Sequence, residues 1–356
     1  MSYLGYANPF YHLGRIVRGY LAAPPPCRPM PSDFYIIGHR GAPLVAPENT
    51  IAAFAKAVEF GANAIETDVC ITQDDCFILW HDADPNDTWA LARQWGGEGL
   101  LYVPDVPALG SPWRRPVREL ALAALRTSCR YIRRKPVPGD NEGGEHVAQV
   151  VPAVFEDFIA WLGHERRVKH IFLDLKFTPG QEDAALSLLA HLYRLTTCGS
   201  FRPDLVFHLL SPHLEIVEAL LAKARRLSLP ATLRLYTDFQ LPGVCDVARQ
   251  LGVRHICMGC GMRLWADFRH EIAEVMAARD DGYFDTVVAW TVNNEAALKE
   301  LVDLGVNGII TDDPALLHRI VMECVHTHSS RVPLTPPAAA QFIEQTAYSW
   351  SPKDAA

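Results

Sequence analysis

The chain of 356 residues lacks any uninterrupted run of about 18 apolar residues, so the sequence predicts no transmembrane helix. Its N-terminal segment also lacks the continuous apolar stretch of a secretory signal peptide. Basic residues are not in excess, because 33 Lys and Arg stand against 41 Asp and Glu and the formal net charge is -8. A nucleic-acid partner, which would favour a basic stripe, is therefore not expected. Nothing in the sequence indicates an obligate protein partner.

Disulfide chemistry is also poorly supported, because the nine cysteines are an odd number scattered over a long chain. This usage favours a reducing, intracellular (cytoplasmic) compartment. Cys70 and Cys76 flank a turn and could face each other across a hairpin, but we expect free thiols. Cys257 and Cys260 form a CxxC without a second pair nearby. A buried strand end that runs into a loop explains them better than a zinc site.

What the sequence does contain is an alternation of strand-like and helix-like segments. Eight short runs are rich in β-branched and aromatic residues, at 34–38, 64–70, 170–176, 205–210, 232–237, 255–259, 286–292 and 308–312. Most are followed by apolar residues at spacings of three and four, the pattern of an amphipathic helix. Eight such units predict an α/β fold of parallel strands closed into a (β/α)8 TIM barrel. An open, doubly wound sheet is the alternative.

Residues 76–150 interrupt this alternation after the second strand. A ninth strand-like run, CFILWHD at 76–82, follows a turn too short for a parallel crossover, so it should form a hairpin outside the barrel. Residues 83–150 hold paired glycines and many prolines, and we expect an insertion there. It should contain a short helix near 118–126 and a flexible loop near 135–146. A lid and an irregular surface loop are both open interpretations.

Two terminal segments flank the predicted barrel domain of residues 33–324. Residues 1–32 have apolar residues at helical spacing and predict an amphipathic extension. It should pack on the barrel or close its bottom, and the alternative is peripheral contact with a membrane surface, for which Arg15 and Arg18 supply few charges. Residues 325–356 are rich in proline and predict an extended or disordered tail.

Polar residues are concentrated where the predicted strands end. Because TIM-barrel active sites lie at the carboxyl ends of the strands, these side chains should share one site. They are His39 and Arg40 after the first strand, Glu66 and Asp68 on the second, His81 and Asp82 on the hairpin, Asp174 and Lys176 on the third, and Trp290 on the seventh. Residues two apart on a strand share a face, so Glu66 points with Asp68, and Asp174 with Lys176.

The three carboxylates Glu66, Asp68 and Asp174 predict a site for one divalent cation. Inward charges in an apolar barrel are costly unless they are paired or bound to metal. An oxygen-rich set of this kind suits Mg2+ or Ca2+ better than Zn2+. The alternative is that the carboxylates only form ion pairs with Lys176 and Arg40.

Two longer blocks resemble the glycerophosphodiester phosphodiesterase family. The block at 39–82, HRGAPLVAPENTIAAFAKAVEFGANAIETDVCITQDDCFILWHD, is similar to that family's succession of HRG, PENT, a helix, ExD and HD. The block at 287–314, VVAWTVNNEAALKELVDLGVNGIITDDP, resembles the family's last two strands. Asp174 departs from the family's usual Glu, and together with GANAIETDV it also resembles the related spider-venom phospholipase D branch. Both belong to the PLC-like phosphodiesterase superfamily.

The resemblance implies a role for each residue at the strand ends. His39 and His81 would be the acid–base pair, since one imidazole can accept a proton while the other donates one. Arg40 and Lys176 would grip the phosphate, and Trp290 would form a wall near the headgroup. Glu66, Asp68 and Asp174 would bind the cation.

Several neighbouring residues allow structural interpretations as well. We expect Glu48 to favour the start of the next helix electrostatically, beside an N-cap at Asn49 or Thr50, and contact with the metal or substrate is the alternative. Asn293 should cap the next helix, with a position at the rim as the alternative, and Asp312 could hold the last loop. Asp82 either orients His81 or shapes the turn. We expect His208 to be a buried histidine of the barrel.

The predicted function is therefore metal-dependent hydrolysis of glycerophosphodiesters to glycerol phosphate and an alcohol. A second prediction is a lysophospholipase D or sphingomyelinase D-like activity on lipid phosphodiesters. Six apolar residues of the insertion would suit an acyl chain or cover the outside of the barrel: Trp89, Trp95, Leu100, Leu101, Tyr102 and Trp113. A third is a binding barrel without catalysis, which would be expected to have lost an acid or a histidine.

Overall fold

The computed structural model describes residues 28–134, 150–199, 201–238, 244–259 and 265–329. The predicted N-terminal helix and the loop near 135–146 lie outside these residues. The described residues divide into two units, one that ends at His318 and one that begins at Arg319. Helix α11 runs from Pro314 to Ser329, past residue 325 where the sequence predicts the tail to begin.

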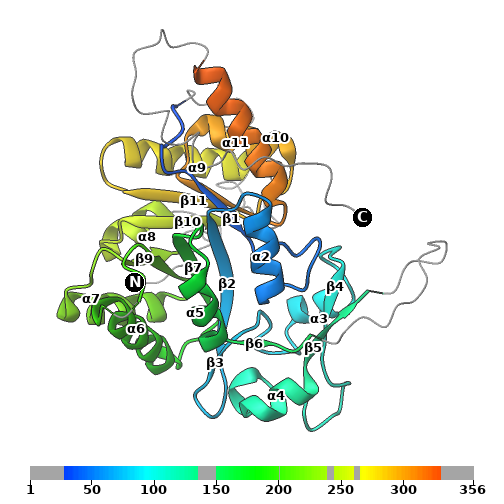
Figure 1. Ribbon diagram of the computed structural model, residues 1–356. Helices are drawn as coiled ribbons and strands as arrows, with labels where there is room; N and C mark the ends of the chain where they lie inside the picture. Colours follow the sequence, from blue (N-terminus) through cyan, green and yellow to red (C-terminus); the bar gives the residue numbers. More distant parts are fainter. Residues whose placement is uncertain (1–27, 135–149, 200, 239–243, 260–264, 330–356) are drawn as a thin grey trace, which may run out of the picture. The chain divides into compact units, whose positions relative to one another are not determined.

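Eight parallel strands close into a barrel, which confirms the predicted fold (Figure 1). The barrel closes because β1 pairs with β12 on one side, Tyr35 opposite Gly308, and with β2 on the other. The strands are β1 (Tyr35–Gly38), β2 (Ala64–Ile71), β7 (His170–Leu175), β8 (Val206–Ser211), β9 (Leu233–Thr237), β10 (His255–Gly259), β11 (Thr286–Trp290) and β12 (Gly308–Thr311).

Helices connect consecutive strands and lie outside the barrel (Figure 1). Most of them match the helical patterns of the sequence closely. They are α2 (Ile51–Glu59), α5 (Phe155–His164), α6 (Glu182–Thr197), α7 (Leu214–Leu227), α8 (Val244–Leu251), α9 (Trp265–Asp280) and α10 (Glu295–Leu304). Within the described residues, no helix is long and apolar enough to cross a membrane.

The hairpin predicted after the second strand is present. Strand β2 extends beyond its pairing with β1, and there its free edge binds β3 (Phe77–Leu79) in antiparallel register. Strand β6 (Ala153–Val154) then pairs with β3. Cys70 lies opposite Ile78 in the hairpin, so it does not face Cys76, and both are free thiols.

The described part of the insertion, residues 83–134, contains regular secondary structure. Its elements are α3 (Thr88–Gln94), β4 (Tyr102–Asp105), the 3-10 turn η2 (Val117–Glu119), α4 (Leu122–Ser128) and β5 (Arg130–Arg133). Strands β4 and β5 pair with each other. Buried residues of the hairpin, such as Trp80, and of the insertion, such as Tyr131, form a small core of their own. The insertion is thereby fixed to the hairpin beside the carboxyl ends of the barrel strands.

The barrel interior follows the period of two expected for strands. On β7 the inward residues are His170, Phe172 and Asp174, and on β9 they continue from Tyr236 to Asp238 just beyond the strand. An apolar middle layer thus separates two polar ends. We call the end at the carboxyl termini of the strands the rim and the opposite end the floor.

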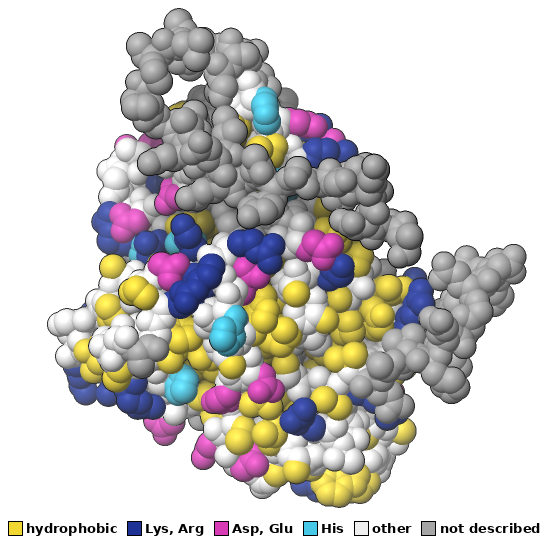
Figure 2. All heavy atoms as spheres, in the orientation of Figure 1, with side chains coloured by type: hydrophobic (Ala, Val, Ile, Leu, Met, Phe, Trp, Pro, Cys, Tyr) yellow, Lys and Arg dark blue, Asp and Glu magenta, His cyan; other side chains and the backbone are white. Residues whose placement is uncertain are grey.

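The surface carries no single sign of charge on the face drawn in Figure 2. Acidic and basic side chains are interspersed there among hydrophobic ones. This distribution accords with the small formal net charge of -8 over 356 residues.

Candidate active site

A cavity of about 680 Å³ opens at the rim. Residues from the barrel strands, from the loops that follow them and from the insertion line this cavity. They are His39, Arg40, Glu66, His81, Trp89, Glu98, Leu100, Asp174, Lys176, Leu210, Asp238, Trp290, Thr291, Asn293, Ile310 and Asp312. The sequence assigns acid–base, substrate-binding or metal-binding roles to eight residues, and seven of them line this cavity. The eighth, Asp68, forms ion pairs with Arg40 and Lys176.

Glu66, Asp68 and Asp174 converge as predicted. One oxygen of each carboxylate lies within 4.8 Å of the others. Glu66 and Asp68 are 3% and 1% exposed, so water screens their charges weakly. Such spacing is compatible with oxygen ligands 2.0–2.6 Å from one cation, the range for Mg2+ and Ca2+. Asp174 Oδ1 is buried and has no hydrogen-bond partner in the described structure, so it is available as a ligand.

Positive charge around these acids is distributed unevenly. Lys176 Nζ lies 3.1 Å from Asp68 and 2.6 Å from Asp174, and Arg40 Nε lies 3.1 Å from Asp68. Burial raises the pKa of Asp68, but Lys176 and Arg40 outweigh it and hold the pKa well below its usual range. Ion pairs with Lys176 and Arg40 therefore balance part of the negative charge of Asp68 and Asp174.

Glu66 differs, because within the described residues it has no side-chain ion pair. Its Oε2 accepts a hydrogen bond of 2.8 Å from the backbone N–H of Arg40. Burial, together with the neighbouring charge of Asp68, raises the pKa of Glu66 to about 8. A carboxylate so placed is stabilised in its charged form by a further cation.

The turn after β1 fixes the backbone that holds Arg40. Arg40 adopts a φ of 51° and Gly41 a φ of 93°, both in the left-handed region. A Cβ on Gly41 would lie 2.5 Å from the backbone of Ala53 in helix α2, so only glycine fits here. The HRG sequence thus brings the Arg40 side chain into the site at the cost of local strain.

The two predicted histidines each bind a carboxylate. His39 Nδ1 lies 2.6 Å from Asp312 Oδ1, and His81 Nδ1 lies 2.6 Å from Asp82 Oδ1. In both cases the Nδ1 hydrogen bond leaves Nε2 for the cavity, since a ring nitrogen bound to a carboxylate fixes the tautomer. Asn293 supports Asp312, because its Oδ1 accepts a hydrogen bond of 2.8 Å from the Asp312 backbone N–H.

The surroundings shift the two imidazoles in opposite directions. For His39, burial and Arg40 lower the pKa, but Asp312 and Glu66 outweigh them and the pKa rises above its usual value. For His81, burial and the nearby charges of Arg40 and Lys176 push the pKa well below its usual value. Near neutral pH one ring is therefore set to hold a proton and the other to accept one.

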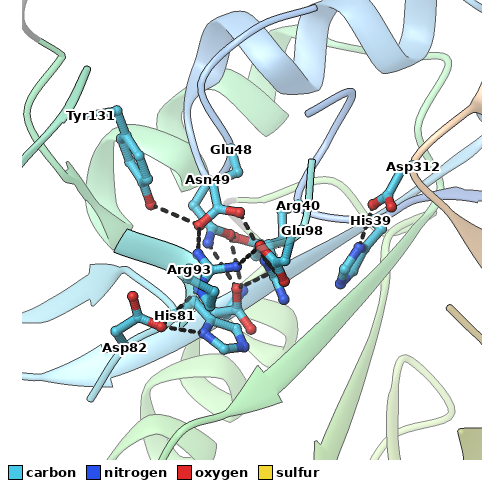
Figure 3. Close-up of polar contacts among 12 residues, drawn as sticks. His39, Arg40, Glu48, Asn49, His81, Asp82, Arg93, Glu98, Tyr131 and Asp312 are labelled. Carbon is cyan, nitrogen blue, oxygen red and sulfur yellow. Dashed lines mark hydrogen bonds and ion pairs between the residues drawn. The ribbon is translucent and has the colours of Figure 1, made fainter. Parts of the chain in front are cut away.

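A network of ion pairs joins these groups to the insertion (Figure 3). Arg40 Nη1 lies 2.8 Å from Glu48 and 3.4 Å from Glu98. Arg93 of helix α3 bonds to Glu48 and Glu98 as well, and its Nε donates to Asp82 over 2.9 Å. Figure 3 shows His39 and Asp312 apart from this network.

On the remaining wall, Trp290 donates a hydrogen bond of 2.5 Å from Nε1 to Asp238 Oδ1. Burial and the charge of Asp174 raise the pKa of Asp238 well above its usual value. The predicted position of Trp290 in the wall is thus observed. His208 does not line the cavity and is fully buried, as expected.

Two sequence interpretations were wrong in detail. The Glu48 carboxylate forms buried ion pairs with Arg40 and Arg93 instead of lying at the helix start. Asn49 in turn donates to Asp68 over 2.8 Å, and Thr50 alone is the N-cap of α2. Helix α10 is capped by Asn294 and not by Asn293.

Three charged residues in or around the site were missed by sequence reasoning. Arg93 and Glu98 lie in the insertion, whose side-chain directions follow no barrel repeat. Asp238 could have been found, because it continues the inward alternation of Tyr236 one step beyond the predicted strand.

Comparison with known proteins bears on this geometry. The glycerophosphoryl diester phosphodiesterase family matches residues 39–193, and a second model of that family matches residues 286–315. Together they cover just over half of the chain, including all eight predicted site residues. The chain belongs to the glycerophosphoryl diester phosphodiesterase family.

Individual relatives match over shorter segments. Glycerophosphodiester phosphodiesterase domain-containing protein 4 of Macaca fascicularis is 53% identical over 49 residues, 14% of this chain and 8% of the relative. Glycerophosphoinositol inositolphosphodiesterase of Homo sapiens is 46% identical over 55 residues, 15% of this chain and 10% of the relative. The match thus spans only a small part of these curated relatives.

A solved structure gives the wider likeness. A phosphodiesterase of Oleispira antarctica, in complex with the product sn-glycerol-3-phosphate, superimposes with a TM-score of 0.56 at 17% identity. The superposition covers 80% of this chain and 96% of that one. At this identity the likeness shows the common barrel fold.

Proposed function

We propose that the protein hydrolyses glycerophosphodiesters to glycerol phosphate and an alcohol. The observation that carries this proposal is the placement of two histidines with opposite pKa shifts beside three converging carboxylates in one cavity. Family membership supports the same reaction.

Glu66, Asp68 and Asp174 would hold one divalent cation, Mg2+ or Ca2+. The fit rests on the partnerless Asp174 Oδ1 and on the raised pKa of Glu66. When bound, the cation supplies Lewis-acid stabilisation of the phosphate charge. The carboxylates themselves keep the ion at the wall of the cavity that Lys176 also lines.

The two histidines divide the proton transfers. His81 is neutral near pH 7 and accepts the proton of the attacking oxygen, which belongs to water or to a neighbouring substrate hydroxyl. His39 keeps its proton and delivers it to the oxygen of the leaving alcohol. Asp82 and Asp312 hold the two rings by their Nδ1 atoms, so each Nε2 is directed to the substrate.

Arg40 and Lys176 would bind the phosphate oxygens. Both line the cavity, and neighbouring carboxylates raise the pKa of each side chain above its usual value, so both are charged at neutral pH. Charge-assisted hydrogen bonds from two cations orient the diester and offset the charge that develops during transfer. Trp290 forms the opposing wall near the headgroup.

The direct test is release of the alcohol from glycerophosphocholine and from glycerophosphoinositol, with Mg2+, Ca2+ or EDTA present. We expect turnover of at least one diester with a cation and its loss with EDTA. The phosphate product, analysed for a cyclic phosphate, identifies the attacking group. Absence of turnover on every diester by cation-loaded protein would refute the proposal.

A second candidate, lysophospholipase D or sphingomyelinase D-like hydrolysis of lipid phosphodiesters, is favoured by one observation. All large hydrophobic side chains that are exposed in the described residues lie on the β1–α2 loop or the insertion: Leu44, Val45, Trp89, Trp95, Leu109 and Trp113. Trp89 also lines the cavity, together with the buried Leu100. Arg114 binds Gln94 of α3 over 2.9 Å, which fixes the Trp113 loop beside that helix.

These side chains would contact the acyl chain or the surface of the lipid phase. Turnover of lysophosphatidylcholine and of sphingomyelin in vesicles should then exceed turnover of glycerophosphocholine. Replacing Trp95, which is 88% exposed, by Ser should lower only the activity on vesicles. Equal loss on both substrates, or no preference for an acylated substrate, would remove this candidate.

A further inference from the structure

Arg93 is a buried arginine that the proposed reaction does not use. It lies near the end of helix α3 in the insertion, and its side chain is 1% exposed. It is not among the residues that line the cavity, so it does not reach the substrate. A guanidinium in this position needs compensating charge, because burial of an unpaired ion is costly.

Its compensation comes from three carboxylates on three separate segments. Nε donates to Asp82 at the end of the hairpin over 2.9 Å, and the two terminal nitrogens bind Glu48 and Glu98. Glu48 precedes helix α2 and Glu98 lies in the insertion. The planar guanidinium fork offers five donors on three nitrogens, so each carboxylate meets its own nitrogen, whereas a lysine would offer its three donors from a single nitrogen.

Each of these carboxylates has a second partner within the site. Asp82 Oδ1, which accepts from Arg93, also lies 2.6 Å from His81 Nδ1. Glu48 and Glu98 lie 2.8 Å and 3.4 Å from Arg40 Nη1. Figure 3 shows Arg93 between these groups, with Asp82 and His81 on one side and the Arg40 partners on the other.

We propose that Arg93 is a positioning residue, which fixes the His81 ring through Asp82 and the Arg40 guanidinium through Glu48 and Glu98. This inference rests on the proposed phosphodiester hydrolysis. It makes the insertion a part of the active site, since helix α3 then sets the orientation of a proton acceptor and of a phosphate ligand. The insertion would act by holding the site, whatever the substrate.

The His81–Asp82 pair offers a readout that a merely structural role would not move. The charged groups that face the pair come from several elements: His39, Arg40, Glu48, Arg93, Glu98 and Lys176. Removing the positive charge of Arg93 makes proton uptake by the pair more favourable, whichever atom carries the proton. The acid limb of kcat/KM should therefore move to higher pH.

The test compares R93M with R93K and with R115M. Arg115 is a matched control, because it lies in the same insertion but its side chain is 55% exposed and contacts no site residue. For R93M we expect kcat/KM on the preferred diester to fall about 100-fold, the usual cost of misplaced groups. Its acid limb should move up by about one pH unit. R93K should lose kcat while its acid limb stays in place, because charge is kept and the fork is lost.

Titration of the His81 imidazole by NMR, assigned with H81N, gives the same answer without substrate. Its midpoint should rise in R93M and remain near wild type in R93K and R115M. If wild-type protein hydrolyses none of the diesters, the proposed function fails, and this titration still decides whether Arg93 governs His81. If R93M does not fold, R93K alone tests the proposal: its kcat should fall while the acid limb of its kcat/KM profile stays at the wild-type pH. Kinetics and a His81 titration of R93M that equal those of R115M would overturn the proposal, as would full activity of R93K.

Discussion

The rim and the floor of the barrel both contain histidines that are buried or partly buried, but only the rim has the features of a catalytic site. At the rim, His39 and His81 each bind a carboxylate and lie beside three further acids. At the floor, His170 binds His208 over 3.0 Å, and the His208 ring stacks on Phe172 at 4.1 Å. The same inward alternation of the strands produces both groups.

Burial disfavours the charged form of the groups at both ends, but opposite charges compensate for it only at the rim. Burial lowers the pKa of His170 and of His255 to about 4, and that of His208 well below its usual value, so these three histidines are uncharged at neutral pH. At the rim, opposite charges counter burial and keep several groups ionised. Clustered histidines alone therefore do not indicate a site, whereas charges kept ionised around a cavity do.

The largest difference should appear when one imidazole is removed from each end. H39A should lower kcat about 1000-fold, because a general acid contributes 10²–10⁴-fold. H208F should leave turnover near the wild-type value, since His208 does not line the cavity. Steady-state kinetics and circular dichroism of the two variants test this. Equal turnover of H39A and wild type would refute the role of His39.

The second largest difference between rim and floor should be the effect of a divalent cation on stability, which we expect at the rim. Because the pKa of Glu66 is raised from 4.5 to about 8, metal-free protein has the full stability contribution of this group below pH 4.5 and loses it as pH rises through 8. A cation at about 100 times its Kd should restore about 2.7 kcal/mol. Thermal unfolding at pH 6 and 8.5, with EDTA or Mg2+, measures this.

The matched variant is E66Q, which should be more stable than wild type in EDTA at pH 8.5 and gain little from Mg2+. Stabilisation of E66Q by Mg2+ equal to that of wild type would show that the cation binds elsewhere.

The floor should titrate in the opposite direction. Its histidines have lowered pKa values, so their stability contribution is full above pH 6.5 and is lost as pH falls to about 4. H208F removes one of these groups, so its free energy of unfolding should fall less between pH 7.5 and 4.5 than that of the wild type. Urea unfolding at the two pH values measures it. An identical loss in both proteins would contradict the assignment.

The smallest effect is expected for Y131F. The Tyr131 hydroxyl donates to Glu48 over 3.4 Å, a weak hydrogen bond, while Arg40 and Arg93 hold the same carboxylate. Removing the hydroxyl should cost less than about 1 kcal/mol of stability. It should change kcat less than R93K does. A larger change would show that the tyrosine hydroxyl, and not the ion pairs, holds Glu48 in place.

Sequence reasoning recovered the barrel because its signals are local and repeated. Each strand run predicts its own element, and eight repeats of the strand–helix unit determine the closure. The rim residues were predicted because they stand at the carboxyl ends of predicted strands. The strand period of two then places Glu66 on the same face as Asp68, and Asp174 on the same face as Lys176.

The insertion could not be predicted in this way. Nothing in the segment TWALARQ marks Arg93 as buried, yet Arg93 is 2% exposed because carboxylates from three separate segments surround it. Its environment is set by tertiary contacts over as many as 45 residues of separation. The paired glycines around Glu98 similarly predict a turn and give no direction for its side chain.

The closing pair of the barrel has a consequence for biosynthesis. Strand β1 pairs with β12, and His39 meets Asp312, 273 residues later in the chain. At 5–20 residues per second, the ribosome needs roughly 15–55 s to supply that partner. During this interval β1 has an unpaired edge, and the first histidine has no carboxylate to orient it. The nascent chain therefore stays inactive until its last strand emerges, and chaperones have that interval in which to shield the open edge.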